Sequence, residues 1–396
     1  MRLRLACLLL SLLAPCACLA QTPTSAEAKP RARDLGVPFD GTPGRLNAIT
    51  DVAGVEVGST TLITGEGALR VGEGPVRTGV TVVLPRGKAE TEPVYAAWFS
   101  LNGNGEMTGT TWVDEGGFLE GPVGITNTHS VGTVRDSFIA WGLKHGASKQ
   151  AWSLPVVAET FDGFLNDING FHVKPEHVFS ALDGAHGGAV PEGNVGGGTG
   201  MVCYGFKGGT GTASRVLSKE LGGYTVGVLV QCNCGRRPQL TVAGVPVGKE
   251  LPEGVPYAMA KPSLSPPGDE VSGDVGSIII VVATDAPLLP HQLKRLAHRA
   301  TLGLARTGST SGNGSGDIFL AFSTANTGAD KVPGPNAVLT VSNERISPLF
   351  TATVEATEEA IVNAMVGAET MVGVDGHTVN ALPHDKLQQV LKKYNR

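Results

Sequence analysis

Residues 303–326 read Gly-Leu-Ala-Arg-Thr-Gly-Ser-Thr-Ser-Gly-Asn-Gly-Ser-Gly-Asp-Ile-Phe-Leu-Ala-Phe-Ser-Thr-Ala-Asn. The polar loop at the start of this stretch changes at Ser315-Gly316-Asp317 into an apolar run, residues 318–322, which predicts a buried strand. The hydroxyl of Ser315 therefore lies immediately before a core strand, between glycines that leave the backbone accessible. This position suits a nucleophile, although a glycine-rich turn into a strand explains the loop as well.

Apolar segments on both sides of this stretch predict an α/β fold. The runs 226–230 and 278–282 are almost continuous in Val, Ile and Leu, as in strands that are covered on both faces. A helix is predicted from Pro290, because its apolar positions keep to one stripe. Together the elements predict sheets between helical layers. Further strands are predicted at 79–84 and 337–341, and further helices at 131–144 and 348–371.

The composition excludes several classes of protein. Among 396 residues, 41% are hydrophobic and 17% charged, which argues against a disordered chain. The net charge of -5 provides no basic face, so we expect no nucleic-acid partner. The glycine-rich block 192–200 leads into an apolar strand without a Gly-Lys-Ser/Thr sequence, so it does not predict a phosphate-binding loop.

The N-terminus has the pattern of a signal peptide. Arg2 and Arg4 precede an apolar core, residues 5–13, and Cys18-Leu19-Ala20 fits a cleavage site. We therefore predict that residues 1–20 are removed, that the protein is exported to the periplasm or secreted, and that no membrane anchor remains. Residues 21–34 are predicted to be a flexible tail, and residues 35–396 a single domain.

Three cysteines remain after removal of the leader: Cys203, Cys232 and Cys234. An odd number, with two cysteines one residue apart on a strand, does not suggest a disulfide framework. Cys232 and Cys234 point to one face of that strand and are predicted to pack as small hydrophobic residues. The histidines show no metal-binding spacing, so neither a metal nor a cofactor is expected.

A second serine with a neighbouring carboxylate follows the predicted strand 337–341. Ser342 and Glu344 face the same side if the extended conformation continues, with Asn343 on the opposite side. A carboxylate can orient a proton, and a base is what a serine nucleophile needs. A solvated strand end would look the same. Polar patches at 102–106 and 126–130 could line a cleft, and turns explain them equally well.

Four segments resemble the P1 peptidase family, which contains the L-aminopeptidase D-alanyl-esterase/amidase and the β-aminopeptidases. They occur in consistent order and cover the chain from about residue 35 to the C-terminus. The segments are Gly41 to Val52, Glu192 to Tyr204, Asp285 to Leu293 and Asn313 to Phe319.

The resemblance implies an inactive precursor that cuts its own chain before a serine nucleophile. The match places the cut between Gly314 and Ser315, which would give subunits 35–314 and 315–396. It implies an αββα four-layer sandwich, assembled as a homo-oligomer of cleaved heterodimers. The implied activity is that of a serine aminopeptidase or amidase, which removes N-terminal residues from short peptides, amides or esters with a free amine.

The resemblance also implies roles for individual residues. Ser342 and Glu344 would assist Ser315, and the Asn343 backbone N–H would help to bind the oxyanion. Tyr204 would line the site, and Glu192 would hold the amine of the substrate.

The oxyanion asparagine of the family falls, by spacing, at Asp285. Because an ionised Asp cannot donate a hydrogen bond, Asn233 or another amide is the alternative donor.

Two other functions are compatible with the sequence. An acyltransferase of the ornithine acetyltransferase type shares this architecture and self-cleavage but has a threonine nucleophile. A non-catalytic exported binding protein would also tolerate the glycine-rich loops.

Overall fold

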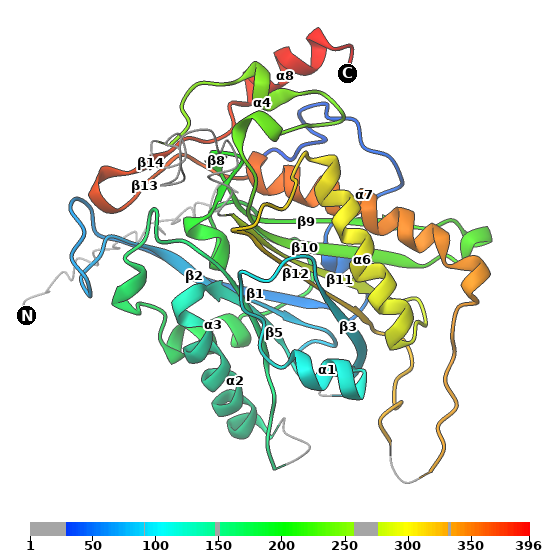
Figure 1. Cartoon of the computed structure of the whole chain (residues 1–396). Helices are drawn as coiled ribbons and strands as arrows, with labels where there is room; N and C mark the ends of the chain where they lie inside the picture. Colours follow the sequence, from blue (N-terminus) through cyan, green and yellow to red (C-terminus); the bar gives the residue numbers. More distant parts are fainter. Residues whose placement is uncertain (1–28, 91, 147–150, 257–275, 332–333) are drawn as a thin grey trace, which may run out of the picture.

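The computed structural model describes residues 29–396, except residues 91, 147–150, 257–275 and 332–333. The predicted signal peptide, 1–20, therefore lies outside the described residues. The strands form two main sheets, and Figure 1 shows α6 and α7 over one of them and α2 and α3 beside the other. None of the helices in the described part of the chain has the length and apolarity needed to cross a membrane.

The larger sheet has six strands in the order β4-β3-β12-β11-β10-β9. Only β11 and β12 pair in parallel, and the other neighbours are antiparallel. Every residue of β10, β11 and β12 is buried, as predicted for strands covered on both faces. The bounds are β3 (Val94–Ser100), β4 (Phe118–Leu119), β9 (Gly209–Val216), β10 (Thr225–Asn233), β11 (Ser277–Thr284) and β12 (Gly316–Ser323).

The smaller sheet has four strands in the order β1-β2-β5-β6, of which β5 and β6 are parallel. Its inner face and that of the larger sheet share one hydrophobic core, in which Val83 and Ile125 lie in the same cluster as Leu229 and Ile279. The bounds are β1 (Glu56–Thr64), β2 (Val76–Leu84), β5 (Val123–Asn127) and β6 (Val156–Thr160). Two hairpins complete the strands: β7 (Val202–Cys203) with β8 (Phe206–Lys207), and β13 (Met371–Val372) with β14 (Thr378–Val379).

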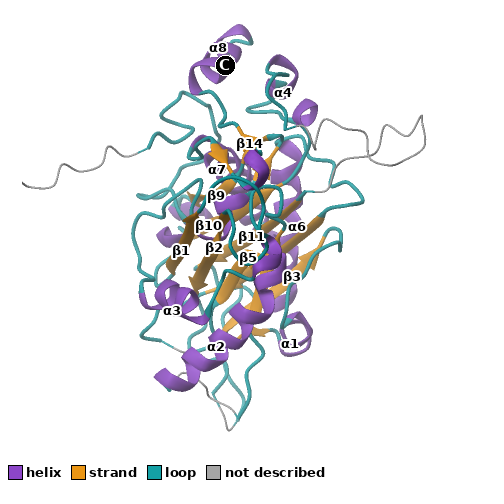
Figure 2. Ribbon diagram, turned by 90° about the vertical axis from the view of Figure 1, so that its left-hand side faces the viewer, coloured by secondary structure: helices purple, strands orange, loops and turns teal. Residues whose placement is uncertain are grey.

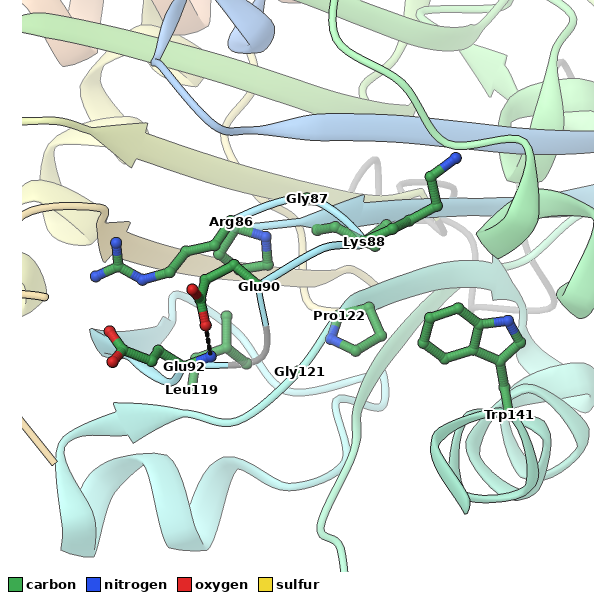
Figure 3. Close-up of a pocket in the computed structure, with 11 residues that line it drawn as sticks. Arg86, Gly87, Lys88, Glu90, Glu92, Leu119, Gly121, Pro122 and Trp141 are labelled. Carbon is green, nitrogen blue, oxygen red and sulfur yellow. Dashed lines mark hydrogen bonds between the residues drawn. The ribbon is translucent and has the colours of Figure 1, made fainter. Parts of the chain in front are cut away.

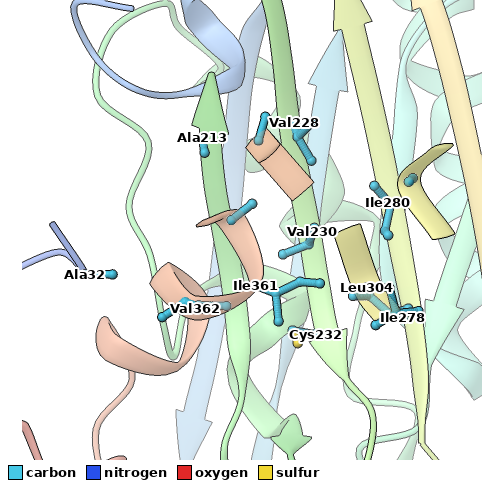
Figure 4. Close-up of a cluster of buried hydrophobic side chains, with 14 of the residues drawn as sticks. Ala32, Ala213, Val228, Val230, Cys232, Ile278, Ile280, Leu304, Ile361 and Val362 are labelled. Carbon is cyan, nitrogen blue, oxygen red and sulfur yellow. The ribbon is translucent and has the colours of Figure 1, made fainter. Parts of the chain in front are cut away.

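Helices cover the sheets, and Figure 2 shows the strands in the middle of the molecule. Figure 4 shows Ile361 of α7 and Leu304 of α6 against Val230 and Ile280 of the larger sheet. The predicted stripe of α6 is confirmed, because Leu293, Leu296 and Leu304 are all buried. The bounds are α1 (Thr110–Gly116), α2 (Val131–His145), α3 (Pro175–Asp183), α4 (Val247–Glu250), α6 (Pro290–Arg306), α7 (Ser347–Val366) and α8 (His384–Lys393).

Helix α6 connects two parallel strands, and this connection positions the site. It runs from the end of β11 back to the start of β12, so both strands begin at the same edge of the sheet. Ser277 of β11 is the Cα partner of Gly316 in β12. A Gly-Ser pair therefore stands at the start of each of these two strands, at the same end of the larger sheet. The pairs are residues 276–277 and 314–315.

One prediction about secondary structure is wrong, and the described part of the predicted tail makes ion pairs with the domain. Residues 337–341 form no strand but part of a loop that extends from the sheets in Figure 1, and Leu339 is 73% exposed. Residues 29–34 of the predicted flexible tail are held in place, because Arg31 pairs with Glu192 and Arg33 with Glu359 at 2.7 and 2.8 Å. The run 337–341 has no neighbouring strand to pair with in the part of the chain that the structure describes, and the tail is bound by carboxylates of distant segments. Both facts depend on tertiary contacts, which local sequence does not reveal.

Candidate active site

Two serines meet where β11 and β12 begin. Ser315 immediately precedes β12 and is 1% exposed, and Ser277 is the first residue of β11 and 6% exposed. The Gly316 N–H donates to Ser277 Oγ at 3.1 Å. A side chain at Gly316 would not fit, because its Cβ would lie 2.4 Å from the Asn104 carbonyl oxygen. Gly316 therefore permits the loop that contains Asn104 to pack tightly against the start of β12.

Ser315 is hydrogen-bonded to a buried carboxylate, that of Asp317, two residues further along the chain. Its Oγ donates to Asp317 Oδ1 at 2.7 Å, which is possible because residues i and i+2 of a strand face the same side. The same oxygen accepts from the Ile278 N–H at 3.2 Å. Asp317 thus joins the Ser315 hydroxyl to the backbone of the residue that follows Ser277.

The predicted polar patch at 102–106 closes over this end of the sheet. Asn102 Oδ1 accepts from the Asp317 N–H at 2.8 Å, and its Nδ2 donates to the carbonyl groups of residues 311 and 312. Asn104 donates from its backbone N–H to the Ser315 carbonyl oxygen at 3.2 Å and from Nδ2 to the Gly314 carbonyl oxygen at 2.8 Å. The patch thus fixes the backbone on both sides of Ser315.

A second buried carboxylate, Glu159 at the end of β6, lies beside the serines. Its oxygens accept from the Thr128 hydroxyl and, at 3.0 Å, from the Glu106 N–H, which brings the predicted patches 102–106 and 126–130 together. A Cβ placed on Gly105 would be 3.2 Å from both Glu159 Oε1 and Gly316 Cα. Burial raises the pKa of Glu159 above its usual value, although the hydrogen bonds from Thr128 and Glu106 oppose the shift.

Asn233, the last residue of β10, provides an amide at the same edge. It is the Cα partner of Ser277 across the antiparallel pair β10–β11. Asn233 Oδ1 accepts from the Val202 N–H at 2.8 Å, which orients the side chain so that Nδ2 is the group that can donate to a ligand. Asn233, which the sequence left open as an alternative to Asp285, therefore lies beside a serine.

Four of the predicted site residues lie at the opposite end of the larger sheet. The Val341 N–H donates to the Pro287 carbonyl oxygen, beyond the C-terminal end of β11, so Ser342 and Glu344 follow at that end. The eight residues of β11 separate the two ends by about 25 Å. The predicted relay from Ser315 through Ser342 and Glu344 is therefore wrong. It depended on a strand at 337–341, which is absent from the described residues.

Asn343 and Asp285 belong to that distant end as well. Asn343 Oδ1 accepts from Arg295 at 2.9 Å, and Asp285 Oδ1 accepts from the Thr225 N–H at 2.7 Å. Neither group can reach an oxyanion at Ser277 or Ser315. Asp285 instead terminates the strand pair, and burial raises its pKa.

Glu192 and Tyr204 are engaged within the chain. The Glu192 carboxylate accepts from Arg31 at 2.7 and 3.1 Å and from the Thr212 N–H of β9 at 2.8 Å, three strands away from β12. It is not brought to the serines. Tyr204 lies near Asn233, because its N–H donates to the Cys234 carbonyl oxygen, but its buried hydroxyl is bonded to Thr307 Oγ1 at 2.7 Å.

A small pocket shown in Figure 3 is also distant from the serines. It is lined by Arg86, Lys88, Glu90, Glu92 and Trp141, among others. Arg86 donates to the Ala325 carbonyl oxygen, beyond the C-terminal end of β12. The pocket therefore lies at the end of the sheet that lacks the two serines.

Solved structures with this fold define the class of protein. The L-aminopeptidase D-Ala-esterase/amidase from Ochrobactrum anthropi, described as a variant among the Ntn hydrolase fold, is 48% identical with a TM-score of 0.84, and the match covers 93% of this chain and 99% of that one. A β-aminopeptidase from a Burkholderia species is 49% identical with a TM-score of 0.80, over 92% of this chain and 98% of that one. The chain accordingly has a mixed α/β fold of the Ntn-hydrolase kind.

The sequence relatives identify the family. The model of peptidase family S58 matches residues 47–379, and the chain belongs to this family. The β-peptidyl aminopeptidase BapA of Sphingosinicella microcystinivorans is 59% identical over 94% of both chains, and that of Sphingosinicella xenopeptidilytica is 50% identical over 93% of this chain and 92% of the other. The chain is therefore an aminopeptidase, a hydrolase acting on peptide bonds. The acyltransferase and the binding protein are not favoured.

Sequence reasoning did not single out Ser277, Asp317 or Glu159, which the structure brings to the same end of the sheet as Ser315. Ser277 had a usable signal, because it stands before the strongest apolar run in the same way that Ser315 stands before 318–322. Asp317 was visible at the i+2 position from Ser315. Glu159 had no local signal, because only the pairing of β5 with β6 and the return of loop 102–106 bring it to the serines.

Proposed function

We propose that the protein is a self-processing serine aminopeptidase whose nucleophile is Ser277, released by cleavage of the Gly276–Ser277 bond. One observation supports Ser277 as the nucleophile. The hydrogen-bonded pair Ser315–Asp317 lies next to it, and the Gly316 N–H between these two residues donates to Ser277 Oγ at 3.1 Å. The sequence predicted a nucleophile with a Ser-x-acid pair beside it. The geometry supports that chemistry with the roles moved, so that Ser315 belongs to the pair and Ser277 is the nucleophile.

The mechanism follows from these positions. Ser277 Oγ attacks the carbonyl carbon of the substrate's first residue, and the proton passes to the Ser277 α-amine or towards Ser315, whose hydroxyl is held by Asp317. Asn233 Nδ2 donates to the oxyanion of the tetrahedral intermediate. The amine of the shortened peptide takes up this proton and leaves. Water then attacks the acyl carbon, which releases the first residue as a carboxylic acid and returns a proton to Ser277 Oγ.

Glu159 is proposed to bind the free amine of the substrate, in place of Glu192. It is a buried carboxylate beside the serines, whereas Glu192 is already paired with Arg31. An ammonium group that enters this buried position would be held by a charge-assisted hydrogen bond. Since two relatives are named β-peptidyl aminopeptidases, we propose peptides with an N-terminal β-amino residue as the preferred substrates.

The precursor is proposed to be an αββα four-layer sandwich that is exported after removal of residues 1–20. Packing of α2 and α3 on the smaller sheet and of α6 and α7 on the larger one supports the four layers. Cleavage before Ser277 would give subunits ending at 276 and beginning at 277, which we propose to assemble as a homo-oligomer of heterodimers.

Mass analysis of the purified protein tests the proposal. Scaled from 40.8 kDa for 396 residues, cleavage before Ser277 gives a C-terminal fragment of about 12 kDa, and cleavage before Ser315 gives one of about 8 kDa. We expect the larger fragment, with Ser277 as its first residue. A fragment beginning at Ser315 would restore that serine as the nucleophile, and an intact, inactive chain would refute self-processing. Hydrolysis of β-alanine, L-alanine and D-alanine p-nitroanilides, compared by kcat/KM, tests the substrate class.

A further inference from the structure

Three buried cysteines from two separate segments form one cluster, the thiol cluster Cys203, Cys232 and Cys234. Cys203 Sγ lies 2.7 Å from Cys232 Sγ and 3.7 Å from Cys234 Sγ, and the last two are also 3.7 Å apart. None of the three is more than 1% exposed. Cys232 is labelled in Figure 4, on β10 beneath α7.

The fold brings these residues together in a way that the sequence did not predict. Cys232 and Cys234 flank Asn233 and share one face of the strand end. Hairpin β7–β8 crosses this face, fixed by hydrogen bonds from Tyr204 N–H to the Cys234 carbonyl oxygen and from Val202 N–H to Asn233 Oδ1. The third sulfur atom therefore comes from Cys203, at the end of β7.

The geometry matches a set of metal ligands. In a tetrahedral thiolate site with metal–sulfur bonds of about 2.3 Å, neighbouring sulfur atoms are separated by about 3.8 Å. Two of the three separations here have that length, and a small rotation of the Cys203 or Cys232 side chain would open the third. Among the described residues, no His, Asp or Glu belongs to the group, so its donors are all soft sulfur atoms.

A buried lysine lies next to the thiol cluster. Lys207 is fully buried, and its Nζ donates to the carbonyl oxygens of Met201 and Gly208 at 2.9 Å, close to Cys203 in the same hairpin. Three thiolates with a divalent ion carry a net charge of -1, which the Lys207 ammonium would balance. Buried charge is tolerated when it is paired in this way.

We propose that the thiol cluster is a binding site for one thiophilic metal ion, Zn²⁺ or Cu⁺, which the sequence alone did not predict. The ion forms bonds to three sulfur atoms, and each thiol that was protonated releases its proton to solvent, with no change of oxidation state. Bound metal would cross-link β7 to β10 on both sides of Asn233. It would therefore stabilise the native state without contacting the substrate.

Metal analysis of the full chain tests the site, with zinc and copper measured separately. We expect about one ion per chain after equilibration with Zn²⁺, or with Cu⁺ under reducing conditions, and the metal that survives dialysis identifies the preferred ion. C203S, C232S and C234S should each lower the bound metal at least tenfold. The matched control C7S/C16S/C18S, made in the full chain that keeps its leader, changes only leader cysteines and should retain the metal.

Two further measurements keep the test decisive. Chelation should lower the Tm of the wild type but not that of a folded C203S variant. This comparison distinguishes a variant that lost a metal ligand from one that lost the metal because it unfolded. Thiols titrated after denaturation of the leader-cysteine control without reductant should number three. A single thiol would show that two of the three cysteines form a disulfide and would overturn the proposal, as would three thiols in a folded protein that takes up neither ion.

Discussion

The two ends of the six-stranded sheet carry the same chemical pattern in opposite environments. At the start of β12, Ser315 and Asp317 are both buried and bonded to each other. At the far end, Ser342 and Glu344 have the same spacing, but both are exposed. An exposed Ser-x-acid pair is common at strand ends and turns, where water competes for its hydrogen bonds. In a buried pair the carboxylate holds the serine hydroxyl in one orientation. Burial, and not spacing, separates the proposed catalytic end from the other.

Three buried carboxylates lie at the end that carries Ser277 and Ser315. Asp317, Glu159 and Asp162 are at most 3% exposed, and Asp162 follows Glu159 by three residues after β6. Burial raises the pKa of Asp162 to about 7, against the hydrogen bonds that it accepts. Carboxyl groups with raised pKa values are common at functional sites, and Glu159 and Asp162 are two such groups beside the proposed nucleophile.

Replacement of Ser277 should have the largest effect. Ser277→Ala removes the proposed nucleophile, so we expect a single uncut chain and a loss of activity of about 10⁴-fold or more. A denaturing gel and a p-nitroanilide assay measure both outcomes. If this variant were cut and active, the catalytic end would have to be assigned again.

Asp317→Asn should have the next largest effect. The amide cannot hold the Ser315 hydroxyl as a carboxylate does, and we expect kcat to fall by about 10² to 10³-fold. Because Asp317 also accepts from the Ile278 N–H, circular dichroism and Tm must show that the variant is folded. Unchanged kcat in a folded variant would exclude Asp317 from the proton pathway.

Glu159→Gln should weaken substrate binding more than turnover. Loss of a charge-assisted hydrogen bond to the substrate amine predicts a rise in KM of about 10 to 100-fold. Stability should not fall at neutral pH, because burial already disfavours the ionised form of Glu159. Steady-state kinetics at saturating substrate separate the two parameters, and a fall in kcat alone would contradict the proposed role.

Asp162→Asn should alter the dependence of stability on pH. The pKa of Asp162 is raised from 3.8 to about 7 by burial, so between these values the native state retains a proton that the unfolded chain has lost. Wild-type stability should therefore decrease as pH rises through this window, with a slope of at most about 1.4 kcal/mol per pH unit.

Buried Lys207 acts above that window and with the opposite sign. Burial lowers its pKa from 10.5 to about 7, so the native state loses a proton that the unfolded chain keeps, and stability should rise with pH. In Asp162→Asn the decrease below pH 7 should disappear, and the pKa of Lys207 should fall further, because the Asp162 charge raises it. Urea unfolding measured across pH 4 to 10 would show this, and an identical profile in the variant would remove Asp162 as its cause.

The smallest effect is expected at the far end. Ser342→Ala and Glu344→Gln change exposed groups about 25 Å from the serines, so activity should stay within about twofold and stability within about 0.5 kcal/mol. The same assays apply. A large loss of activity in either folded variant would break the comparison between the two ends.

The elements that the sequence predicted well are those with a strong local signal. The runs 226–230, 278–282 and 318–322 lie in β10, β11 and β12, and the stripe from Pro290 forms α6. The boundaries of α2 differ from the prediction by one residue, whereas the helix predicted at 348–371 ends at Val366. The prediction of a strand at 337–341 failed because an apolar run forms a strand only when another strand accepts its hydrogen bonds.

The sequence by itself determined the family, the buried strands and the presence of a serine at the entrance to a core strand, because motifs and hydrophobic runs are local properties of the chain. Tertiary structure alone decided which groups meet. The parallel pairing of β11 with β12 through α6 places Ser277 beside Ser315, although they are 38 positions apart in sequence. It likewise brings Glu159 to these serines and Cys203 to the pair Cys232 and Cys234, because strand pairing joins residues whose distance along the chain carries no signal of their contact.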